Sequence, residues 1–481
     1  MSAETASKAQ PYRRRARRRL SRLTKAVSAS LPDAAATPAY RARQLAKRGF
    51  FGSVRAQRQF IAASEKWSSD QLEHWQWERL TAVLAHAYTT VPFYRAQGLD
   101  HRELRGWEDF RRLPLLEKSD LQERGEELLS EAVDVHRREY TTTGGSTGEP
   151  VGAWHDVDRY QAVEMAFMLD QWSRVGYRVG DPTAIVRGTP LPDGRLWEKD
   201  LPRAELRLSS FDLEEEQMAQ MLDRARRFRP RFLQAYPSSA FLLAQYMIDA
   251  SEPRIDSLSG LLCGSENLYG WQRKLIYEAF GVRPYSWYGQ TEQVCLAGEC
   301  EFDTSLHIFP QYSFAELVDA ADRVITEPGL TGTIVGTTFF CDAMPLIRYR
   351  TDDRAAYADG PCKLCGRPYR RLAAIDGRLQ EFMVSHSGRP VSMTAINLSA
   401  LSDTVRQYRF VQEIPGAVRL LVVAKPGYRA DRDEARIRHE LAPLLRPDIE
   451  LTRIELVDSI APTASGKHRF LDQHLAVSFS D

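Results

Sequence analysis

The sequence lacks any apolar run that approaches the about 18 consecutive residues needed to cross a bilayer. No apolar core typical of a signal peptide follows the first residues. Six cysteines in 481 residues are too few for a disulfide framework and suit a reducing compartment. The net charge is only +1, so there is no global reason to expect nucleic acid or an acidic partner. These absences favour a soluble, cytoplasmic protein without a membrane span.

One basic segment, Arg13–Arg19, interrupts this neutral composition. It lies in an acid-poor stretch, rich in serine and alanine, that ends near Pro38. Such a block is typical of a solvated, disordered tail, and we therefore assign residues 1–38 to a basic leader. An electrostatic anchor for a polyanion and a targeting segment remain alternatives.

The pattern of the remaining sequence first changes near Glu139. From about Arg41 to Gln97 it is helical, and after Glu139 short apolar runs alternate with helical stretches. This alternation predicts an α/β fold of layered sheets and helices in a large domain, residues 39–377. The expected strands are Pro182–Arg187, Arg231–Tyr236, Leu258–Cys263, Pro284–Tyr288 and Thr333–Thr337, and the expected helices are Val157–Arg174, Asp212–Phe228 and Ser238–Ala250.

A second change falls at Asp376-Gly377-Arg378. Beyond it the sequence predicts a small α+β domain, residues 378–481, of about 100 residues. Its expected strands are Arg409–Gln412, Val418–Ala424 and Glu450–Val457, with a charged helix from about Asp431 to Leu445.

The stretch Thr141–Pro150, TTTGGSTGEP, is too rich in glycine and hydroxyl groups for a core. Glycines let backbone N–H groups approach a ligand, and hydroxyls donate flexibly to oxygens, so the loop suits a polyphosphate. It lacks the Lys-Ser/Thr ending of a Walker loop. A polar turn that leads into the next helix is the alternative. The expected phosphate-binding residues are Thr142, Thr143, Gly144, Gly145, Ser146, Thr147 and Gly148.

Three further motifs follow in a fixed order. They are Tyr288–Glu292 (YGQTE), Ile347–Asp353 (IRYRTDD) and Pro462–Lys467 (PTASGK). With the glycine-rich loop and the Asp-Gly-Arg junction, this set resembles the adenylate-forming superfamily, from about residue 75 to the end. Within it the chain looks most like the phenylacetate–CoA ligases and the capsule-biosynthesis adenylyltransferase-like proteins grouped with them. The resemblance to this branch rests on Thr-Gly-Gly-Ser-Thr-Gly without a following lysine, Glu299-Cys300, Met344–Tyr349 and Cys362-x-x-Cys365-Gly366-Arg367.

The resemblance implies an AMP-forming acid ligase. A carboxylate is a poor acyl donor, and coupling it to the α-phosphate of ATP makes a mixed anhydride with AMP as leaving group, with release of pyrophosphate. The charge that develops on phosphorus oxygens requires donors and cations. By resemblance, Thr291 binds the α-phosphate, Glu292 holds Mg²⁺ and Asp353 binds the ribose. Gly264, Ser265 and Glu266 line the adenine plane, and Tyr288, Gly289 and Gln290 complete the nucleotide site.

The small domain would act as a mobile lid. Lys467 is implied to reach the α-phosphate and the carboxylate during adenylation and to leave for the second step. Arg378 would add a cation near the ribose and phosphate. Two departures from the family pattern occur: Gln380 stands where the hinge usually has Asp or Lys, and Asp352 replaces the glycine of Thr-Gly-Asp. Whether Asp352 or Asp353 faces the ribose therefore stays open.

Cys362 and Cys365 form a half site for one tetrahedral ion. Cys300 and His307 offer the second half, and Cys295 competes for the place of Cys300. Four protein ligands leave no position for catalysis, so the expected Zn²⁺ is structural. Unliganded thiols or a redox pair are the alternative. Cys263 and Cys341 lie in apolar runs and are expected to be buried.

The acid pocket is the part on which the sequence is least informative. By the same resemblance, the acid would face Tyr236, Ser238, Trp287 and Tyr288, whose aromatic rings suit an aryl or small hydrophobic acid, and His155 lies near the phosphate loop. Packing of these residues in the core is the alternative. Coenzyme A is the expected acceptor, with an amine, a carrier protein or AMP left on the acceptor as alternatives. A non-catalytic, polyanion-binding scaffold is a third hypothesis, and the oligomeric state stays open, with a homodimer among the options.

Overall fold

The computed structural model describes residues 32–142, 152–157, 159–187, 191–210, 212–213, 215–266, 268, 270–375, 382–388, 390–392, 404–424, 427–445, 448–460, 471–473 and 475. Arg13–Arg19, Thr143–Gly148, Arg378, Gln380 and Lys467 lie outside these residues, as do the side chains of Thr142, Ser238 and Asp352.

The described residues build one large sheet of 13 strands in the order β12-β11-β13-β14-β15-β10-β9-β8-β7-β6-β3-β5-β4. The run β5-β3-β6-β7-β8 is parallel, and pairing turns antiparallel between β8 and β9. The strands are β3 (Thr183–Val186), β4 (Trp197–Asp200), β5 (Glu205–Leu208), β6 (Phe232–Ala235), β7 (Gly260–Gly264), β8 (Pro284–Gly289), β9 (Leu296–Gly298), β10 (Leu306–Ile308), β11 (Ser313–Val318), β12 (Val324–Ile325), β13 (Thr331–Thr338), β14 (Tyr349–Tyr357) and β15 (Arg371–Ile375).

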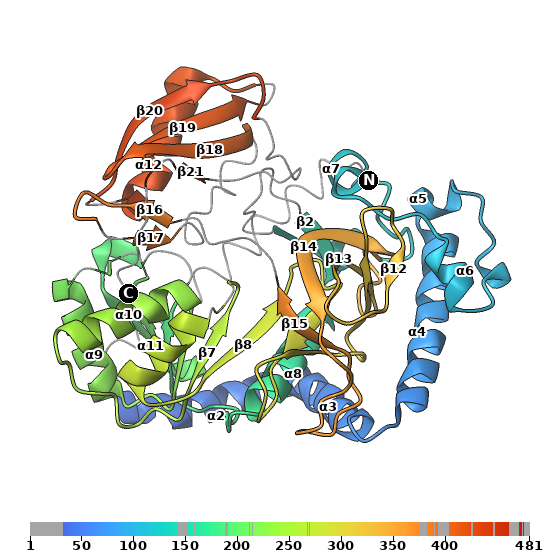
Figure 1. Ribbon diagram of the computed structural model, residues 1–481, viewed down its shortest axis with the longest axis horizontal. Helices are drawn as coiled ribbons and strands as arrows, with labels where there is room; N and C mark the ends of the chain where they lie inside the picture. The colour runs from blue at the N-terminus through green and yellow to red at the C-terminus, as the bar shows by residue number, and fades with distance from the viewer. Residues whose placement is uncertain are drawn as a thin grey trace.

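Helices cover both faces of the parallel part (Figure 1). Leu261 and Cys263 of β7 pack with α9 (Glu215–Phe228), α10 (Pro237–Asp249) and α11 (Gly270–Phe280). Leu262 points the other way, into a cluster with α3 (Arg48–Ser64) and α8 (Arg159–Ser173). Because the strand is buried on both faces, its sequence is a continuous apolar run rather than an alternating one.

Among the N-terminal helices, α4 (Ser69–Thr90) packs against the antiparallel part. It begins with a capping box between Ser68 and Gln71 and buries Leu80 and Leu84 against the segment before β14. The remaining elements of the large domain are η1 (Asp33–Ala35), α2 (Ala36–Ala46), α5 (Pro92–Arg95), η2 (His101–Glu103), α6 (Trp107–Arg111), α7 (Lys118–Glu123), η3 (Val135–Arg137), β1 (Arg138–Thr142), β2 (Gly152–Asp156), η4 (Pro192–Gly194) and η5 (Leu201–Arg203). None of the described helices combines the length and apolar character that crossing a membrane requires.

The C-terminal domain has its own sheet and core, coloured orange to red in Figure 1. Its strands pair in the order β20-β19-β18-β21, and Ile437, Leu441 and Leu445 of the helix are buried against them. The predicted fold class, a large α/β domain with a small α+β domain, is confirmed. The elements are β16 (Phe382–Val384), β17 (Pro390–Ser392), β18 (Val405–Ile414), β19 (Ala417–Ala424), α12 (Ala430–Leu445), β20 (Glu450–Leu456) and β21 (Leu471–Gln473).

Candidate functional site

The carboxyl ends of four parallel strands bring polar side chains to one edge of the sheet. Arg187 follows β3, Tyr236 follows β6, Ser265 follows β7 and Gln290 follows β8. The Arg187 guanidinium lies 5.4 Å from the centre of the Tyr236 ring and contacts the Ser265 hydroxyl at 3.4 Å. Ligands of open α/β sheets bind outside this edge, so we place the candidate site here.

The Trp287 ring occupies the space that a side chain at position 264 would need, so only glycine fits there. A Cβ atom on Gly264 would lie 2.4 Å from that ring. Trp287 is 8% exposed and packs edge-on against Trp172, with ring centres 5.6 Å apart. The ring therefore forms a fixed wall below the strand ends, and little of its surface is left for a ligand.

A tight turn carries Thr291 and Glu292. The Gln293 N–H donates to the Gln290 carbonyl at 3.2 Å, which places the two residues at the central positions of the turn. Gln293 has a φ of 57°, in the left-handed region that residues other than glycine seldom occupy. Glu292 is 9% exposed. Such local backbone strain is common at functional sites.

A chain of hydrogen bonds fixes the first side of this turn. The Gln290 amide oxygen accepts the Cys295 N–H at 3.1 Å, and its amide nitrogen donates to the Tyr288 hydroxyl at 2.9 Å. The Tyr288 hydroxyl donates in turn to Asp353 Oδ2 at 2.8 Å. Burial and the Asp353 carboxylate raise the pKa of Tyr288, so the phenol keeps its proton.

Asp353 reaches Tyr288 because β14 carries an irregularity. The register of β14 against β13 shifts between Thr333 and Val335. At this point the Thr351 hydroxyl donates to the Ile334 carbonyl at 2.8 Å and accepts the Asp353 N–H at 3.2 Å. A bulge of this kind changes the direction of a side chain. The side chain of Asp353, the candidate ribose ligand, therefore points toward Tyr288.

His155 lies on the other side of the turn, on β2. It is 1% exposed, stacks on Tyr160 with ring centres 4.1 Å apart and packs against the Thr291 backbone. Burial lowers the pKa of His155 to about 4, although the contact with Thr291 opposes the shift. The imidazole is therefore neutral near pH 7 and supports the turn as a packed, uncharged ring.

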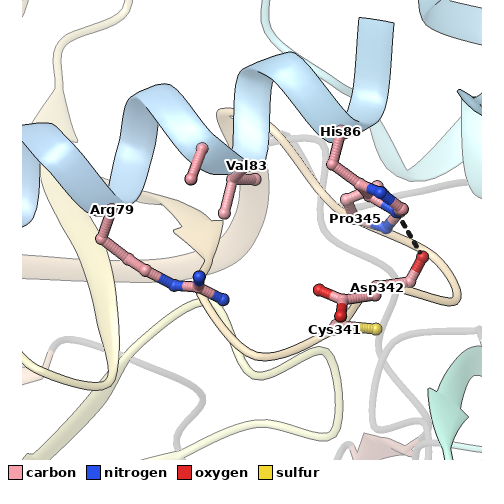
Figure 2. A pocket seen from close by; sticks show the side chains of 7 residues that line it. Arg79, Val83, His86, Cys341, Asp342 and Pro345 are labelled. Atoms are coloured by element: carbon pink, nitrogen blue, oxygen red, sulfur yellow. Dashed lines mark hydrogen bonds between the residues drawn. The ribbon is translucent and has the colours of Figure 1, made fainter. Parts of the chain in front are cut away.

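A small cavity borders Cys341 (Figure 2). The Cys341 sulfur lies 4.0 Å from His155 Nδ1. The cavity lies between α4 and the loop 341–345, and His86 Nε2 contacts the Asp342 carbonyl at 2.9 Å across it. Its volume of about 30 Å³ holds one or two waters, whereas ligand pockets take about 300 Å³ or more. We therefore exclude this cavity as a substrate site.

A cluster of cysteine and histidine side chains includes residues that follow β9 in the chain. The ligand atoms of Cys300, His307, Cys362 and Cys365 all lie within 4.8 Å of one another. His307 Nδ1 contacts the Ser305 carbonyl at 3.1 Å, which places the ring proton there and directs Nε2 toward Cys365 Sγ, 3.4 Å away. Burial lowers the pKa of His307 to about 4. Three sulfurs and one neutral imidazole nitrogen suit a tetrahedral ion.

Ion pairs tie this cluster to the N-terminal helices. Arg367 donates to both Glu301 oxygens, at 2.7 and 2.8 Å, and to Glu65 Oε1 at 2.9 Å. Glu65 directly follows α3, and its Oε1 atom also accepts a hydrogen bond from Arg174 Nη2 at 3.1 Å. The cluster thus links the loop after β9, the segment before β15 and the end of α3.

The predicted residues fall into three groups. The structure brings the four predicted metal ligands together, whereas Cys295 lies apart from them, buried beside Asp353. At the strand edge it gathers Tyr236, His155, Gly264, Ser265, Glu266, Trp287, Tyr288, Gly289, Gln290, Thr291, Glu292 and Asp353. Lys467, Arg378, Thr143–Gly148 and the side chains of Thr142 and Ser238 lie outside the described residues, and their roles stay predictions.

Sequence reasoning missed four residues: Arg187, Gln293, Glu164 and Tyr312. The Gln293 amide nitrogen donates to Glu164 Oε2 at 3.0 Å, and the Tyr312 hydroxyl donates to the same oxygen at 2.6 Å. Gln293 follows the Tyr288–Glu292 motif directly, which was the one available signal. Glu164 and Tyr312 are distant in sequence, and nothing in the pattern connects them.

The chain matches no known family profile. It is 29% identical over 370 residues to the phenylacetate-coenzyme A ligase of Thermus thermophilus, covering 73% of this chain and 80% of that one. Identity to the Pseudomonas putida protein of the same name is 26% over 345 residues, covering 68% and 75%. Protein CapK of Staphylococcus aureus is 21% identical over 376 residues, covering 74% and 79%.

Solved structures show the same fold. 2-Hydroxyisobutyryl-CoA ligase with 2-HIB-AMP and CoA, in its thioesterification state, superposes with a TM-score of 0.58 at 20% identity, covering 86% of this chain and 92% of that one. Its postadenylation state gives a TM-score of 0.54 at 20% identity, covering 85% and 91%. The sequence relatives and the structural neighbours agree. The chain is similar in sequence to phenylacetate-coenzyme A ligases and shares the fold of 2-hydroxyisobutyryl-CoA ligase.

Proposed function

We propose that the protein couples a small carboxylic acid to ATP, releases pyrophosphate and transfers the acyl group from the adenylate to coenzyme A. The observation that carries the proposal is the Gln290–Gln293 turn, linked through Tyr288 to Asp353 at the carboxyl edge of the parallel strands. The named activity of the relatives and the acyl-AMP and CoA bound to the structural neighbour support it.

The described residues have distinct tasks in this reaction. The Thr291 hydroxyl would donate to the α-phosphate, and the Asp353 carboxylate would accept from the ribose hydroxyls. Glu292, a nearly buried carboxylate on the same turn, fits the oxygen ligand that Mg²⁺ prefers. When bound there, Mg²⁺ neutralises charge on the phosphate oxygens.

The acid would lie near Tyr236, whose ring supports an aryl or small hydrophobic acid, with the nearly buried Trp287 ring as packing behind the pocket. Arg187, beside Tyr236, adds a cation to this pocket. The glycine-rich loop Thr143–Gly148 would hold the β- and γ-phosphates, and Arg378 would lie near the ribose. We also propose that Zn²⁺ occupies the Cys300, His307, Cys362 and Cys365 cluster as a structural ion.

A pyrophosphate-release screen across a panel of carboxylic acids, with and without coenzyme A, tests the function. We expect pyrophosphate and AMP to form with one class of acid, and acyl-CoA to accumulate when coenzyme A is present. Acid-dependent pyrophosphate exchange that coenzyme A does not affect would instead identify an amine or a carrier protein as the acceptor. No acid-dependent pyrophosphate with any member of the panel would contradict the proposal.

Lys467→Ala tests the two-step mechanism. If Lys467 serves only adenylation, the variant should form adenylate slower by about 100-fold or more, while transfer from a preformed adenylate is largely retained. Single-turnover rates of both half-reactions measure this. Equal losses in the two half-reactions would contradict the alternation of the small domain.

A further inference from the structure

Glu164 is a largely enclosed carboxylate that has no part in the proposed reaction. It lies on α8, and the Gln293 amide and the Tyr312 hydroxyl both donate to its Oε2 atom, at 3.0 and 2.6 Å. Burial raises the pKa of Glu164, and the two donors oppose the shift. Enclosing a carboxylate costs free energy even when it is hydrogen-bonded, so an apolar residue would serve packing better at this place.

The partner of Glu164 is the residue that closes the catalytic turn. Gln293 donates its backbone N–H to the Gln290 carbonyl at 3.2 Å and holds the left-handed φ of 57°. A non-glycine residue keeps this conformation only where its surroundings hold it. The side chain of Gln293 is 4% exposed and its amide is fixed by Glu164.

The two glutamines of the turn are thus fixed in parallel ways. The side chain of Gln290 is held by the Tyr288 hydroxyl and the Cys295 N–H, and that of Gln293 is held by Glu164. Thr291 and Glu292 lie between them. The first anchor belongs to the candidate nucleotide site, because Tyr288 also bonds Asp353. The second comes from a helix and from Tyr312, which directly precedes β11.

We propose that Glu164 is a positioning residue for acid adenylation, which acts through Gln293 to hold Thr291 and Glu292 in the geometry that the reaction needs. This inference rests on the proposed function and extends it to a residue outside the motifs. Tyr312 assists by orienting the Glu164 carboxylate. Glu164 itself needs no contact with ATP or with the acid.

The expected effect is on the rate of adenylation rather than on binding. A displacement of about 1 Å in a reacting or stabilising group costs about 100-fold in rate. Glu164→Ala should therefore lower kcat of acid-dependent pyrophosphate exchange by about 100-fold, with KM for ATP within about 3-fold of wild type. Thioester formation from a preformed acyl-adenylate should stay within about 3-fold of wild type, because the phosphate chemistry is already complete.

Two conservative variants separate positioning from packing. Glu164→Gln keeps the shape and one acceptor oxygen, so it should recover most of the lost kcat. Tyr312→Phe removes one donor but leaves the Gln293 bond, so its loss should be smaller than that of Glu164→Ala. Urea unfolding of each variant reports whether the fold is intact.

A double-mutant cycle with Gln293→Ala tests whether the effect of Glu164 passes through Gln293. If Glu164 acts through Gln293, Glu164→Ala should cost almost nothing further in kcat once Gln293 is alanine. Additive losses, or kcat unchanged in Glu164→Ala, would overturn the proposal.

A crystal structure of Glu164→Ala gives a readout that needs no activity. Residue 293 should leave the left-handed region, and the 291–292 turn should shift. An unchanged turn would contradict the inference. Absence of acid-dependent exchange in the wild-type protein would instead contradict the proposed function, and this structure would still decide the role of Glu164.

Discussion

The Gln290–Gln293 turn and the cluster of Cys300, His307, Cys362 and Cys365 lie at the two ends of one short strand, β9, yet they are held in different ways. The turn at Thr291–Glu292 is fixed by hydrogen bonds from two glutamine side chains, and its backbone is strained at Gln293. The cluster around Cys300 brings four ligand atoms toward one point, and Arg367 braces it with short ion pairs.

The difference indicates that the two regions have different roles, ligand binding for the turn and structural support for the cluster. A turn whose central residues stand at the open edge of parallel strands can meet a ligand and let it go. Four ligand atoms that face one another leave no open position, so a metal there can only fix the chain. The cluster would stabilise the fold and hold the far end of β9, while the turn would take part in the proposed chemistry. A substitution in one region should therefore leave the other region unaffected.

Removing the metal should have the largest effect, and on stability alone. A structural ion contributes about 4 kcal/mol to the free energy of unfolding when its free concentration is about 1,000 times its Kd. We expect one Zn²⁺ per chain by elemental analysis, and a loss of about this size in urea unfolding of Cys362→Ser. Cys263→Ala is the matched control, because this buried cysteine lies outside the cluster. Wild-type stability in Cys362→Ser, or a metal-free wild-type protein, would contradict the assignment.

Glu292→Gln should instead lower the rate of adenylation and leave the stability of the fold unchanged. Removing one group that stabilises charge in a transition state costs about 100- to 1,000-fold in kcat, and we expect this loss in adenylation with unfolding unchanged. Glu299→Gln is the matched control on the cluster side, since the buried Glu299 carboxylate pairs with Arg273 and with Arg283 at 3.0 Å. Glu299→Gln should destabilise the fold and spare the rate per folded molecule. A destabilised but fully active Glu292→Gln would reverse the two roles.

The sequence was sufficient to predict β3, β6, β7 and β8 of the parallel run, though not β5, and to single out the four residues of the cysteine–histidine cluster. Short apolar runs such as Leu258–Cys263 predicted β7, because a doubly buried strand has a continuous apolar pattern. Cys362 and Cys365 were found by their spacing, and Cys300 and His307 by the proximity of two metal-binding residue types. These signals are local in the chain, so a single sequence contains them in full.

The contacts that shape the Gln290–Gln293 turn could not be predicted from the sequence. Glu164 and Gln293 are 129 positions apart, and Tyr288 and Asp353 are 65 apart. Such pairs depend on how α8 and β14 pack around β8, which neither periodicity nor spacing encodes. The short antiparallel strands, such as β9 with three residues, were missed because three residues carry no usable alternation.

Gly264→Ala should have an intermediate effect, confined to the strand edge. Its new Cβ would lie 2.4 Å from the Trp287 ring, and overpacking of this kind costs about 1–3 kcal/mol. We expect a lower free energy of unfolding and a higher KM for ATP, because the ring lies beside the nucleotide segment. Gly270→Ala is the control, since a Cβ there meets nothing within 4 Å. Equal stability and KM in the two variants would show that Trp287 yields without cost.

The smallest expected effect compares two tyrosines of β8, one for each region. Tyr288 bonds Asp353, whereas the fully buried Tyr285 donates to the Glu299 carbonyl at 2.8 Å on the cluster side. Losing one such hydrogen bond costs about 1 kcal/mol, or about fivefold in an equilibrium constant. Tyr288→Phe should therefore raise KM for ATP about fivefold, and Tyr285→Phe should lower the free energy of unfolding by about 1 kcal/mol with KM unchanged. If both substitutions changed KM alike, the strand would transmit strain between turn and cluster, and the separation of the two regions would fail.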